Sequence, residues 1–147
     1  MVRTRTLTIR TNGPGLTEFT GQAEAHVAGS GVAAGVLALH VRHTSASLLI
    51  QENADPDVRA DLRAFFERLA PRASQAGMEW ITHRSEGPDD MPAHIRAAVL
   101  PTNLTVPIVD GRLSLGTWQG IYLFEHRDRP HRREVVLCAI GEATEGT

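Results

Sequence analysis

Apolar and polar side chains alternate along much of this chain with a period of two, which places successive side chains on opposite faces of a β-strand. The alternation is clearest over residues 3–10, and strands are also predicted over residues 16–19, 36–41, 47–52, 104–109, 112–115, 120–124 and 134–140. Asn12-Gly13-Pro14-Gly15 separates the first two strands, and Asp110-Gly111 is a hairpin signal, because both residue types tolerate the backbone angles of tight turns.

Other stretches have the spacing of an amphipathic helix. The strongest covers residues 56–69, where Asp55 supplies an N-cap, Pro56 fits the first turn, and apolar side chains recur at helical spacing. A shorter helix is predicted over residues 22–27.

A third helix is predicted to begin at Asp89 or Asp90, either of which can cap it. Its start places His94 about one turn from the amino end. The residues expected to face inward are Ile95, Ala98 and Val99.

Strands in the first third, helices between them and a closing antiparallel meander indicate an α+β fold. At 147 residues and 41% hydrophobic content, the chain is long enough for one complete core and short for two. We therefore expect a single domain with an ordered core over about residues 3–142. The chain has no apolar run of membrane-spanning length and no signal-peptide core at its start, so we expect a soluble, cytoplasmic protein without a membrane partner.

The charge balance narrows the choice of partners. A formal net charge of −2 argues against a general nucleic-acid binder, which needs a positive face to displace counterions from phosphates. All 15 basic residues are arginine. The absence of lysine excludes Schiff-base chemistry and a Walker-type phosphate loop, so any phosphate must be held by arginine, backbone amides or a metal.

Histidines are the main candidates for chemistry. His43 extends the buried row of the strand over residues 36–41, and a hydrogen-bonded turn histidine is an equally good interpretation of it. His94, near a helix amino end, is favoured as a neutral imidazole that binds a metal or accepts a proton. If His83 and Asp90 converge with His94, the three can hold a divalent cation, although their spacing matches no standard metal motif and a surface role for His83 alone is more common.

The strand that follows Thr117 carries further candidates. Alternation puts Gln119 and Glu125 on one side and Trp118 on the other. A carboxylate that ends an apolar row suggests a raised pKa or a charged partner for Glu125, unless the side chain simply reaches solvent. Trp118 offers a flat ring for stacking a heterocycle, although a core tryptophan is the commoner case. The basic run over residues 126–133 looks like a phosphate grip but also fits a solvated loop.

Three strings in this order resemble the YjbQ-like family, also called the secondary thiamine-phosphate synthase family. They are HTSASLLIQENADPDV from His43, DDMPAHI from Asp89 and DGRLSLGTWQGI from Asp110, and the resemblance extends over about residues 3–142. It implies a sandwich of two packed, mainly antiparallel sheets with three helices, assembled as a homotrimer with sites near subunit boundaries. The positions that match the family's polar residues are His43, Asn53, Asp55, His83, Asp90, His94, Trp118, Gln119 and Glu125.

The resemblance also implies a weak thiamine-phosphate synthase activity, in which a pyrimidine pyrophosphate joins a thiazole phosphate and pyrophosphate leaves. For such a reaction we assign His43 and His94, with Mg²⁺ or another divalent metal held through Asp90, to the pyrophosphate. Arg112 is assigned to phosphate, and Glu125 to the aminopyrimidine. The heterocycle is assigned to Trp118 and Gln119, and Asn53 and Asp55 complete the substrate-binding set.

Two other functions remain open from the sequence. One is a metal-dependent hydrolase of a small phosphate or amide, with the histidines as metal ligands and Glu125 as base. The other is a non-enzymatic trimer that binds a small metabolite. A stoichiometric transition metal in the purified protein would favour the hydrolase, and ligand stabilisation without turnover would favour the binding protein.

Overall fold

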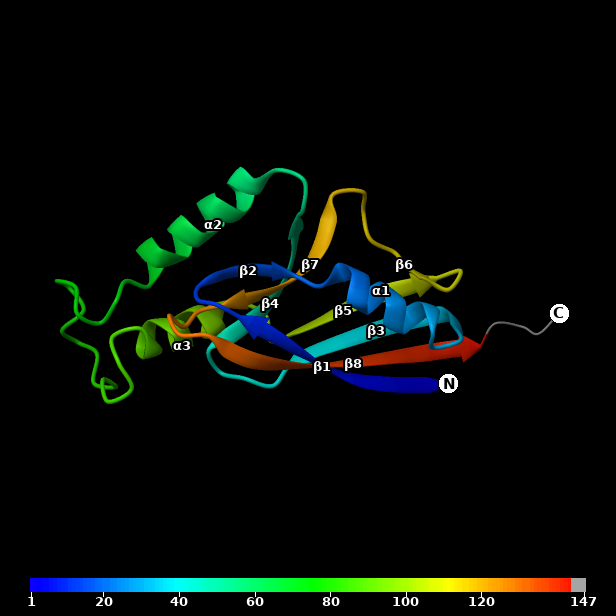
Figure 1. Cartoon of the computed structure of the whole chain (residues 1–147), viewed down its shortest axis with the longest axis horizontal. Coiled ribbons are helices and arrows are strands. Elements are labelled where there is room, and N and C mark those ends of the chain that lie inside the picture. Colours follow the sequence, from blue (N-terminus) through cyan, green and yellow to red (C-terminus); the bar gives the residue numbers. More distant parts are fainter. Residues whose placement is uncertain (144–147) are drawn as a thin grey trace.

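The computed structural model describes residues 1–143, which form two antiparallel sheets and three helices (Figure 1). The strands are β1 (Val2–Thr11), β2 (Gly15–Glu18), β3 (Val32–Val41), β4 (Ala46–Glu52), β5 (Asn103–Val109), β6 (Arg112–Leu113), β7 (Gln119–Glu125) and β8 (His131–Ala143). The helices are α1 (Thr20–Ala28), α2 (Pro56–Leu69) and α3 (Asp90–Val99). The predicted α+β class and the predicted elements are confirmed, with every boundary within a few residues of the expected one.

The larger sheet has the order β1-β8-β3-β5-β6, and the smaller sheet has the order β2-β7-β4. The predicted closing meander is wrong. Only β5 and β6 form a hairpin, through Asp110 and Gly111 at positive φ, whereas β7 lies between β2 and β4. Strand β7 is the centre of the smaller sheet, and its residues 120–125 are buried because the larger sheet covers one face and side chains such as Phe66 of α2 cover the other.

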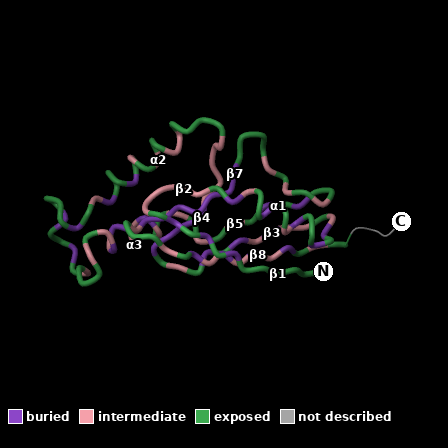
Figure 2. Tube along the Cα trace, viewed as in Figure 1, coloured by how far each residue is buried: buried purple, intermediate pink, exposed green. Residues whose placement is uncertain are grey.

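The main core fills the space between the two sheets. The larger sheet contributes alternate side chains such as Leu37, Leu39 and Leu137, all fully buried, and β7 contributes Ile121 and Leu123. Figure 2 shows these buried segments running through the middle of the molecule, with exposed chain around them. The core therefore depends on the period-two pattern that the sequence displays.

The two longer helices cover the outer face of the smaller sheet only in part. The side chain of Asp55 caps α2 by accepting the backbone N–H of Asp57 at 2.9 Å, as expected. Phe66 packs edge-on against Phe124 of β7, but Phe65 is 56% exposed, so part of the apolar stripe of α2 is uncovered by this chain.

The predicted inward face of α3 is wrong. Val99 is 61% exposed, and the buried positions are instead Asp90, Pro92, Ala93 and Arg96. The helix is rotated because Asp90 and Arg96 find buried partners, an arginine for the carboxylate and a backbone carbonyl for the guanidinium. No helix among residues 1–143 is long and apolar enough to cross a membrane.

Candidate functional site

An irregular segment, residues 70–89, joins α2 to α3 and carries His83. It has a small apolar core of its own, formed by Ala73, Met78 and Ile81 with Met91 packed against them. The guanidinium of Arg84 ties the segment together by donating to three backbone carbonyls, those of Ile81, Ala73 and Met78, at 2.8 to 2.9 Å. One side chain thus fixes the backbone on both sides of His83, which makes this segment an ordered platform rather than a loose loop.

His83, Asp90 and His94 converge, which is the condition that the sequence left open. One ligand atom from each lies within 4.8 Å of the others. The Oδ2 atom of Asp90 lies 2.6 Å from His83 Nε2 and 3.2 Å from His94 Nε2. Asp90 and His94 are four residues apart on α3 and therefore share a helix face, whereas His83 comes from the irregular segment.

Hydrogen bonding fixes the tautomer of His94. Its Nδ1 atom lies 3.1 Å from the carbonyl oxygen of Thr44, which only accepts, so Nδ1 carries the proton. In the neutral imidazole, Nε2 then points its lone pair at the Asp90 carboxylate, and two acceptors 3.2 Å apart repel each other unless a proton or a cation lies between them. A backbone carbonyl behind a metal-binding histidine is the usual arrangement in metalloproteins.

Arg127 orients the carboxylate from the other side. It donates to Asp90 Oδ1 at 2.7 Å, to Asp89 Oδ2 at 2.8 Å and to the carbonyl oxygen of Glu86 at 3.0 Å. Burial acts to raise the pKa of Asp90, but the hydrogen bond from His83 and the charge of Arg127 outweigh it, so the pKa is lowered. Asp90 is therefore an anion at neutral pH, with Oδ1 held by Arg127 and Oδ2 turned toward the two imidazoles.

These three residues fit a divalent metal ion. Ligand atoms that are each about 2 Å from a metal lie about 3 Å from one another, which is close to the 2.6 and 3.2 Å that separate Asp90 Oδ2 from the two imidazole nitrogens. The set leaves coordination positions open, as in catalytic rather than structural sites. Its nitrogen content suits Zn²⁺, Mn²⁺ or Fe²⁺ better than Mg²⁺, which prefers oxygen ligands.

A cavity of about 240 Å³ adjoins this cluster, lined by His43, Thr44, His94, Ala97, Ala98 and Thr102. His43 and His94 thus share a cavity, as predicted. The Nε2 atom of His43 accepts the backbone N–H of Glu134 at 2.8 Å, so its proton is on Nδ1, for which residues 1–143 provide no acceptor. Burial and the nearby charge of Arg133 lower the pKa of His43, so the ring is a neutral donor at physiological pH.

Glu125 lies near this end of β7 but is completely buried. It has the charged partner that the sequence suggested: Arg133 donates to its two carboxylate oxygens at 2.5 and 2.7 Å. Thr11 and the backbone N–H groups of His126 and Arg127 also donate to it. Burial acts to raise its pKa, yet these donors lower it. The alternative of a side chain in solvent is wrong, and the five hydrogen bonds leave no free oxygen for a ligand.

Four of the predicted substrate-binding residues lie at the opposite end of β7. In the pairing of β4 with β7, Glu125 faces Ala46 and Gln119 faces Glu52, a separation of about 20 Å along the strands. Trp118 is 62% exposed there, and its carbonyl accepts the N–H of Asn53. Gln119 caps the backbone of Gly116, and Asp55 caps α2. One chain therefore does not bring Asn53, Asp55, Trp118 and Gln119 to the histidines.

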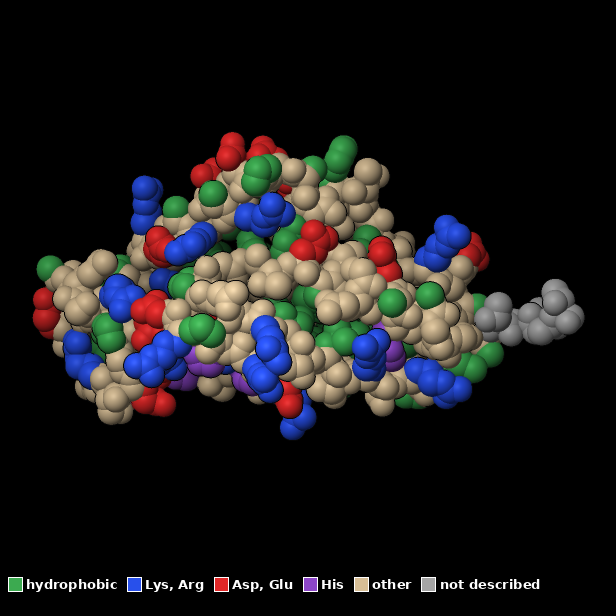
Figure 3. Space-filling view, in the orientation of Figure 1, with side chains coloured by type: hydrophobic (Ala, Val, Ile, Leu, Met, Phe, Trp, Pro, Cys, Tyr) green, Lys and Arg blue, Asp and Glu red, His purple; other side chains and the backbone are tan. Residues whose placement is uncertain are grey.

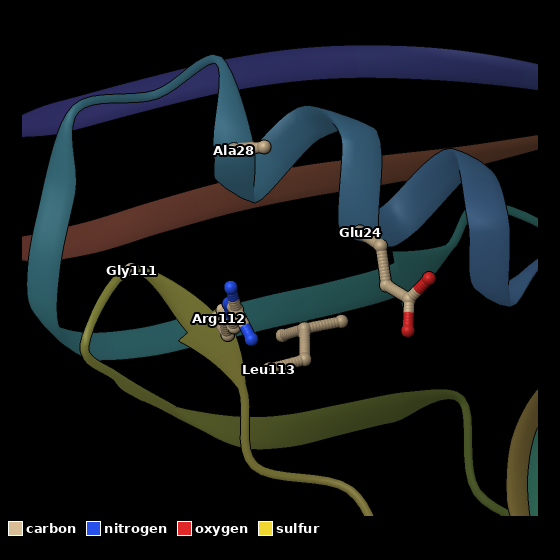
Figure 4. Close-up of a pocket in the computed structure, with 5 residues that line it drawn as sticks. All are labelled: Glu24, Ala28, Gly111, Arg112 and Leu113. Carbon is tan, nitrogen blue, oxygen red and sulfur yellow. The ribbon is translucent and has the colours of Figure 1, made fainter.

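Arg112 occupies a third location. It lies on β6 beside α1 and lines a cavity of about 340 Å³ with Glu24, Ala28, Gly111 and Leu113 (Figure 4). Figure 4 shows Arg112 and Glu24 reaching toward the space between the helix and the hairpin. The hairpin lies at the end of β5 opposite Thr102, so Arg112 does not reach the histidine cluster within one chain.

The sequence reasoning missed Arg84 and Arg127. Arg84 gives no local signal, because its three partners are carbonyls whose positions depend on the folded segment. Arg127 stood out only as part of a basic run, and neither a phosphate grip nor a solvated loop describes its pairing with Asp89 and Asp90. The one signal in the sequence is the pair Asp89-Asp90 at the start of α3, since two adjacent carboxylates suggest a basic partner nearby.

Fold and cluster together define an α+β two-sheet protein with a candidate metal centre of two histidines and one aspartate. The chain belongs to the UPF0047 protein YjbQ-like family, whose sequence model matches residues 5–142. It is 53% identical to UPF0047 protein sll1880 of Synechocystis over 92% of this chain and 90% of that protein. It is 47% identical to UPF0047 protein YjbQ of Salmonella typhimurium over 76% and 77% of the two chains.

Solved structures agree with this assignment. A yjbq/upf0047 family protein of Clostridium acetobutylicum, described as the orthologue of Bacillus subtilis yugu, superposes with a TM-score of 0.79 at 32% identity. The match covers 94% of this chain and 99% of that one. The conserved hypothetical protein TT1486 of Thermus thermophilus gives a TM-score of 0.76 at 34% identity, covering 90% and 97%. The two-sheet architecture is thus shared with these two solved structures.

Proposed function

We propose that this protein is a cytoplasmic, metal-dependent enzyme of the secondary thiamine-phosphate synthase type, acting on small phosphorylated heterocycles. The observation that supports this most directly is the convergence of His83, Asp90 and His94 beside the cavity that His43 lines. In the reaction, the carbon–oxygen bond to the pyrophosphate breaks, a carbon–nitrogen bond to the thiazole forms, and pyrophosphate leaves.

The residues at the cluster have distinct roles in this proposal. His83, Asp90 and His94 hold a divalent cation, which supplies positive charge to the departing pyrophosphate. Arg127 keeps Asp90 in place, and the carbonyl of Thr44 keeps His94 in the tautomer that exposes Nε2. His43 donates its Nδ1 hydrogen to an oxygen of the pyrophosphate, because the other ring nitrogen is already engaged by Glu134.

We further propose that the active site is completed across subunits of a homotrimer. The support is geometric: the histidine cluster and Trp118 lie at opposite ends of the buried strand β7, and the ring of Trp118 is exposed. Phe65 of α2, whose neighbour Phe66 packs against Phe124 toward the histidine end of β7, is also exposed and is suitable for covering by another copy. In such an assembly, Trp118 and Gln119 of one subunit bind the heterocycle beside the histidines of another.

Complementation of inactive variants tests both parts. His94→Ala and Trp118→Ala should each abolish thiamine phosphate formation from a hydroxymethylpyrimidine pyrophosphate and a thiazole phosphate. When the two variants are unfolded, mixed and refolded together, activity should return, because some interfaces then combine two intact halves. Unchanged activity of His94→Ala would remove the cluster from catalysis, and inactive mixtures of well-folded trimers would place the site within one subunit.

A metal-dependent hydrolase of a small phosphate is a second candidate. The donor set favours it, because two imidazoles with one carboxylate resemble the ligands that hold water-activating Zn²⁺ or Mn²⁺. Metal analysis of protein purified without added metal, followed by phosphatase assays with the retained ion, separates the two. One Zn²⁺ per chain with phosphate release, and no thiamine phosphate, would establish the hydrolase instead.

A further inference from the structure

Arg96 is a buried cation without a counterion. Its side chain lies on the inner face of α3 and is 8% exposed as a residue. The Nη2 atom donates to the carbonyl oxygen of Ala70 at 2.9 Å, but Nε is buried and has no hydrogen-bond partner. Among residues 1–143, no carboxylate lies within ion-pair distance of this guanidinium.

Such an arrangement is unfavourable unless something else binds the free donors. Buried charges in proteins are usually paired. A buried N–H without an acceptor loses its hydrogen bonds to water and gains no other bond, which destabilises the folded state. Arg96 is not needed to hold the histidine cluster, because its contact is with the end of α2 and not with His83, Asp90 or His94. The other buried side-chain atom without a partner among residues 1–143, Nδ1 of His126, lies near enough for Arg96 to lower the pKa of His126, but it forms no hydrogen bond with Arg96. The donors of Arg96 therefore remain open to an acceptor from outside the chain.

The guanidinium borders a cavity of about 270 Å³, whose lining is Pro14, Glu67, Arg72, Gln75, Arg96 and Asp128. Both carboxylates in this lining are already paired, Asp128 with Arg72 at 2.6 Å and Glu67 with Arg63 at 3.1 Å. Neither carboxylate forms an ion pair with Arg96, although both attract its charge through space. Figure 3 shows acidic and basic side chains gathered at the end of the molecule where this cavity lies, near α3 and the irregular segment.

We propose that this cavity is a binding site for an oxyanion of the phosphate type, either free phosphate or the phosphate group of a small metabolite, held by Arg96 together with Arg72 and Gln75. Arg96 provides Nη1, which has no hydrogen-bond partner among residues 1–143 and, unlike Nε, is not fully enclosed by the protein. Arg72 provides its guanidinium fork, and Gln75 provides an amide. That number of donors exceeds what the two oxygens of a carboxylate accept and suits the oxygens of a phosphate.

The ion pair between Arg72 and Asp128 makes the site accessible. Both side chains are almost half exposed, and exposed pairs of this kind contribute little stability, so Arg72 can exchange its partner at low cost. The same two residues also line a neighbouring cavity of about 510 Å³ that includes Asp89 and Arg127. An anion at Arg96 therefore lies beside the support of the histidine cluster but requires no metal there.

Phosphate titration of the full-length protein, followed by ¹H–¹⁵N spectra that include arginine Nε–H signals, tests the proposal. With ionic strength held constant by NaCl, the Nε–H signal of Arg96 should shift in a saturable manner as inorganic phosphate is added. A phosphorylated sugar as second titrant separates the two sources, because tighter binding than free phosphate indicates a metabolite. No saturable shift with either titrant would overturn the proposal and leave a cavity that holds water only.

Variants give an independent readout by calorimetry. Arg96→Met should weaken phosphate binding by at least about tenfold, and Arg72→Met by severalfold, because each removes charge-assisted donors. Arg72 is exposed enough for its variant to fold even if Arg96→Met does not. Arg68→Met, on the same helix as Glu67 but outside the cavity, is the matched control and should bind normally.

His94→Ala should also retain phosphate binding, since it removes only the metal cluster. Loss of binding in His94→Ala would show that the anion belongs to the metal site. Equal binding by the wild-type protein, Arg96→Met and Arg72→Met would place the anion elsewhere on the chain. Either result would refute the assignment to Arg96.

Discussion

Replacing Glu125 with glutamine decides whether this carboxylate acts in chemistry or in folding. Glu125 is fully buried and accepts five hydrogen bonds, two of them from Arg133. A glutamine has the same shape but must turn an NH₂ group toward one of these sets of donors. The substitution therefore removes the negative charge and leaves Arg133 buried without a counterion. It also points the NH₂ group of the glutamine at donors that now bind a carboxylate oxygen.

The expected loss of unfolding free energy is about 3–5 kcal/mol, the range found when one partner of a buried ion pair is removed. Glu134→Gln is the matched control: it lies on the same strand as Arg133, and its partner Arg42 is largely exposed, so its loss should be below about 1 kcal/mol. The double variant Glu125→Gln/Arg133→Met should be more stable than Glu125→Gln alone, because it leaves no unpaired buried charge.

Urea unfolding followed by circular dichroism, at several protein concentrations to account for assembly, measures these differences. The pKa of Glu125 is lowered below its ordinary value of 4.5, so its contribution is complete above that value and is lost as the pH falls through the lower folded pKa. The wild-type protein should therefore lose this contribution only below about pH 4.5. A loss below about 1 kcal/mol in Glu125→Gln, with thiamine phosphate formation abolished, would refute the structural role and restore Glu125 as a catalytic group.

Three further predictions address other parts of the molecule. Arg84→Met should weaken metal affinity by about tenfold or more, because it frees the backbone around His83. A competition titration with a chromogenic chelator measures this affinity, and Arg129→Met, at an exposed position, is the control that should have no effect. Equal metal affinities of Arg84→Met and the wild-type protein would show that Arg84 does not position His83. Burial and Arg96 lower the pKa of His126 to about 3, so below about pH 6.5 the unfolded chain takes up a proton first and this residue should reduce stability by about 1.4 kcal/mol per pH unit. Urea titrations across that range should show a slope smaller by this amount in His126→Phe, while the lowered pKa of His43 still contributes in the same direction. Gly35→Ala would place a methyl carbon 2.0 Å from the backbone oxygen of Ile140, so it should lower the free energy of unfolding by at least about 3 kcal/mol. Gly21→Ala, which has open space at its Cβ, is the control and should change thermal stability little.

Most strands could be predicted from the sequence because their side-chain patterns are local, whether alternating as in β1 or continuously apolar as in β7, and α2 could be predicted because Asp55 and Pro56 mark its start. The partners of the strands were not readable: nothing near Gln119–Glu125 says that β7 lies between β2 and β4. The inner face of α3 was misjudged because a hydrophobic pattern treats Arg96 as exposed, whereas a carbonyl at the end of α2 holds it inside.

Part of the candidate site also follows from local sequence, and the rest depends on tertiary structure. Asp90 and His94 lie four residues apart on one helix, so their proximity follows from helix geometry alone. His83 joins them through an irregular segment whose shape depends on Arg84, and Arg127 arrives from the end of β7. Trp118 was grouped with the histidines because both belong to the family's strings, but the length of β7 separates them within one chain.

The two-sided burial of β7 has a consequence for ligand capture. A strand that is hydrogen-bonded along both edges and packed on both faces neither bends nor slides, so the span between its ends stays constant on the timescale of turnover. One subunit therefore cannot close around a ligand by moving Trp118 toward His94. Because Arg84 also fixes the backbone of residues 70–89, closure over a ligand has to come from a neighbouring molecule, and β7 keeps the two ends of the subunit at a constant distance meanwhile.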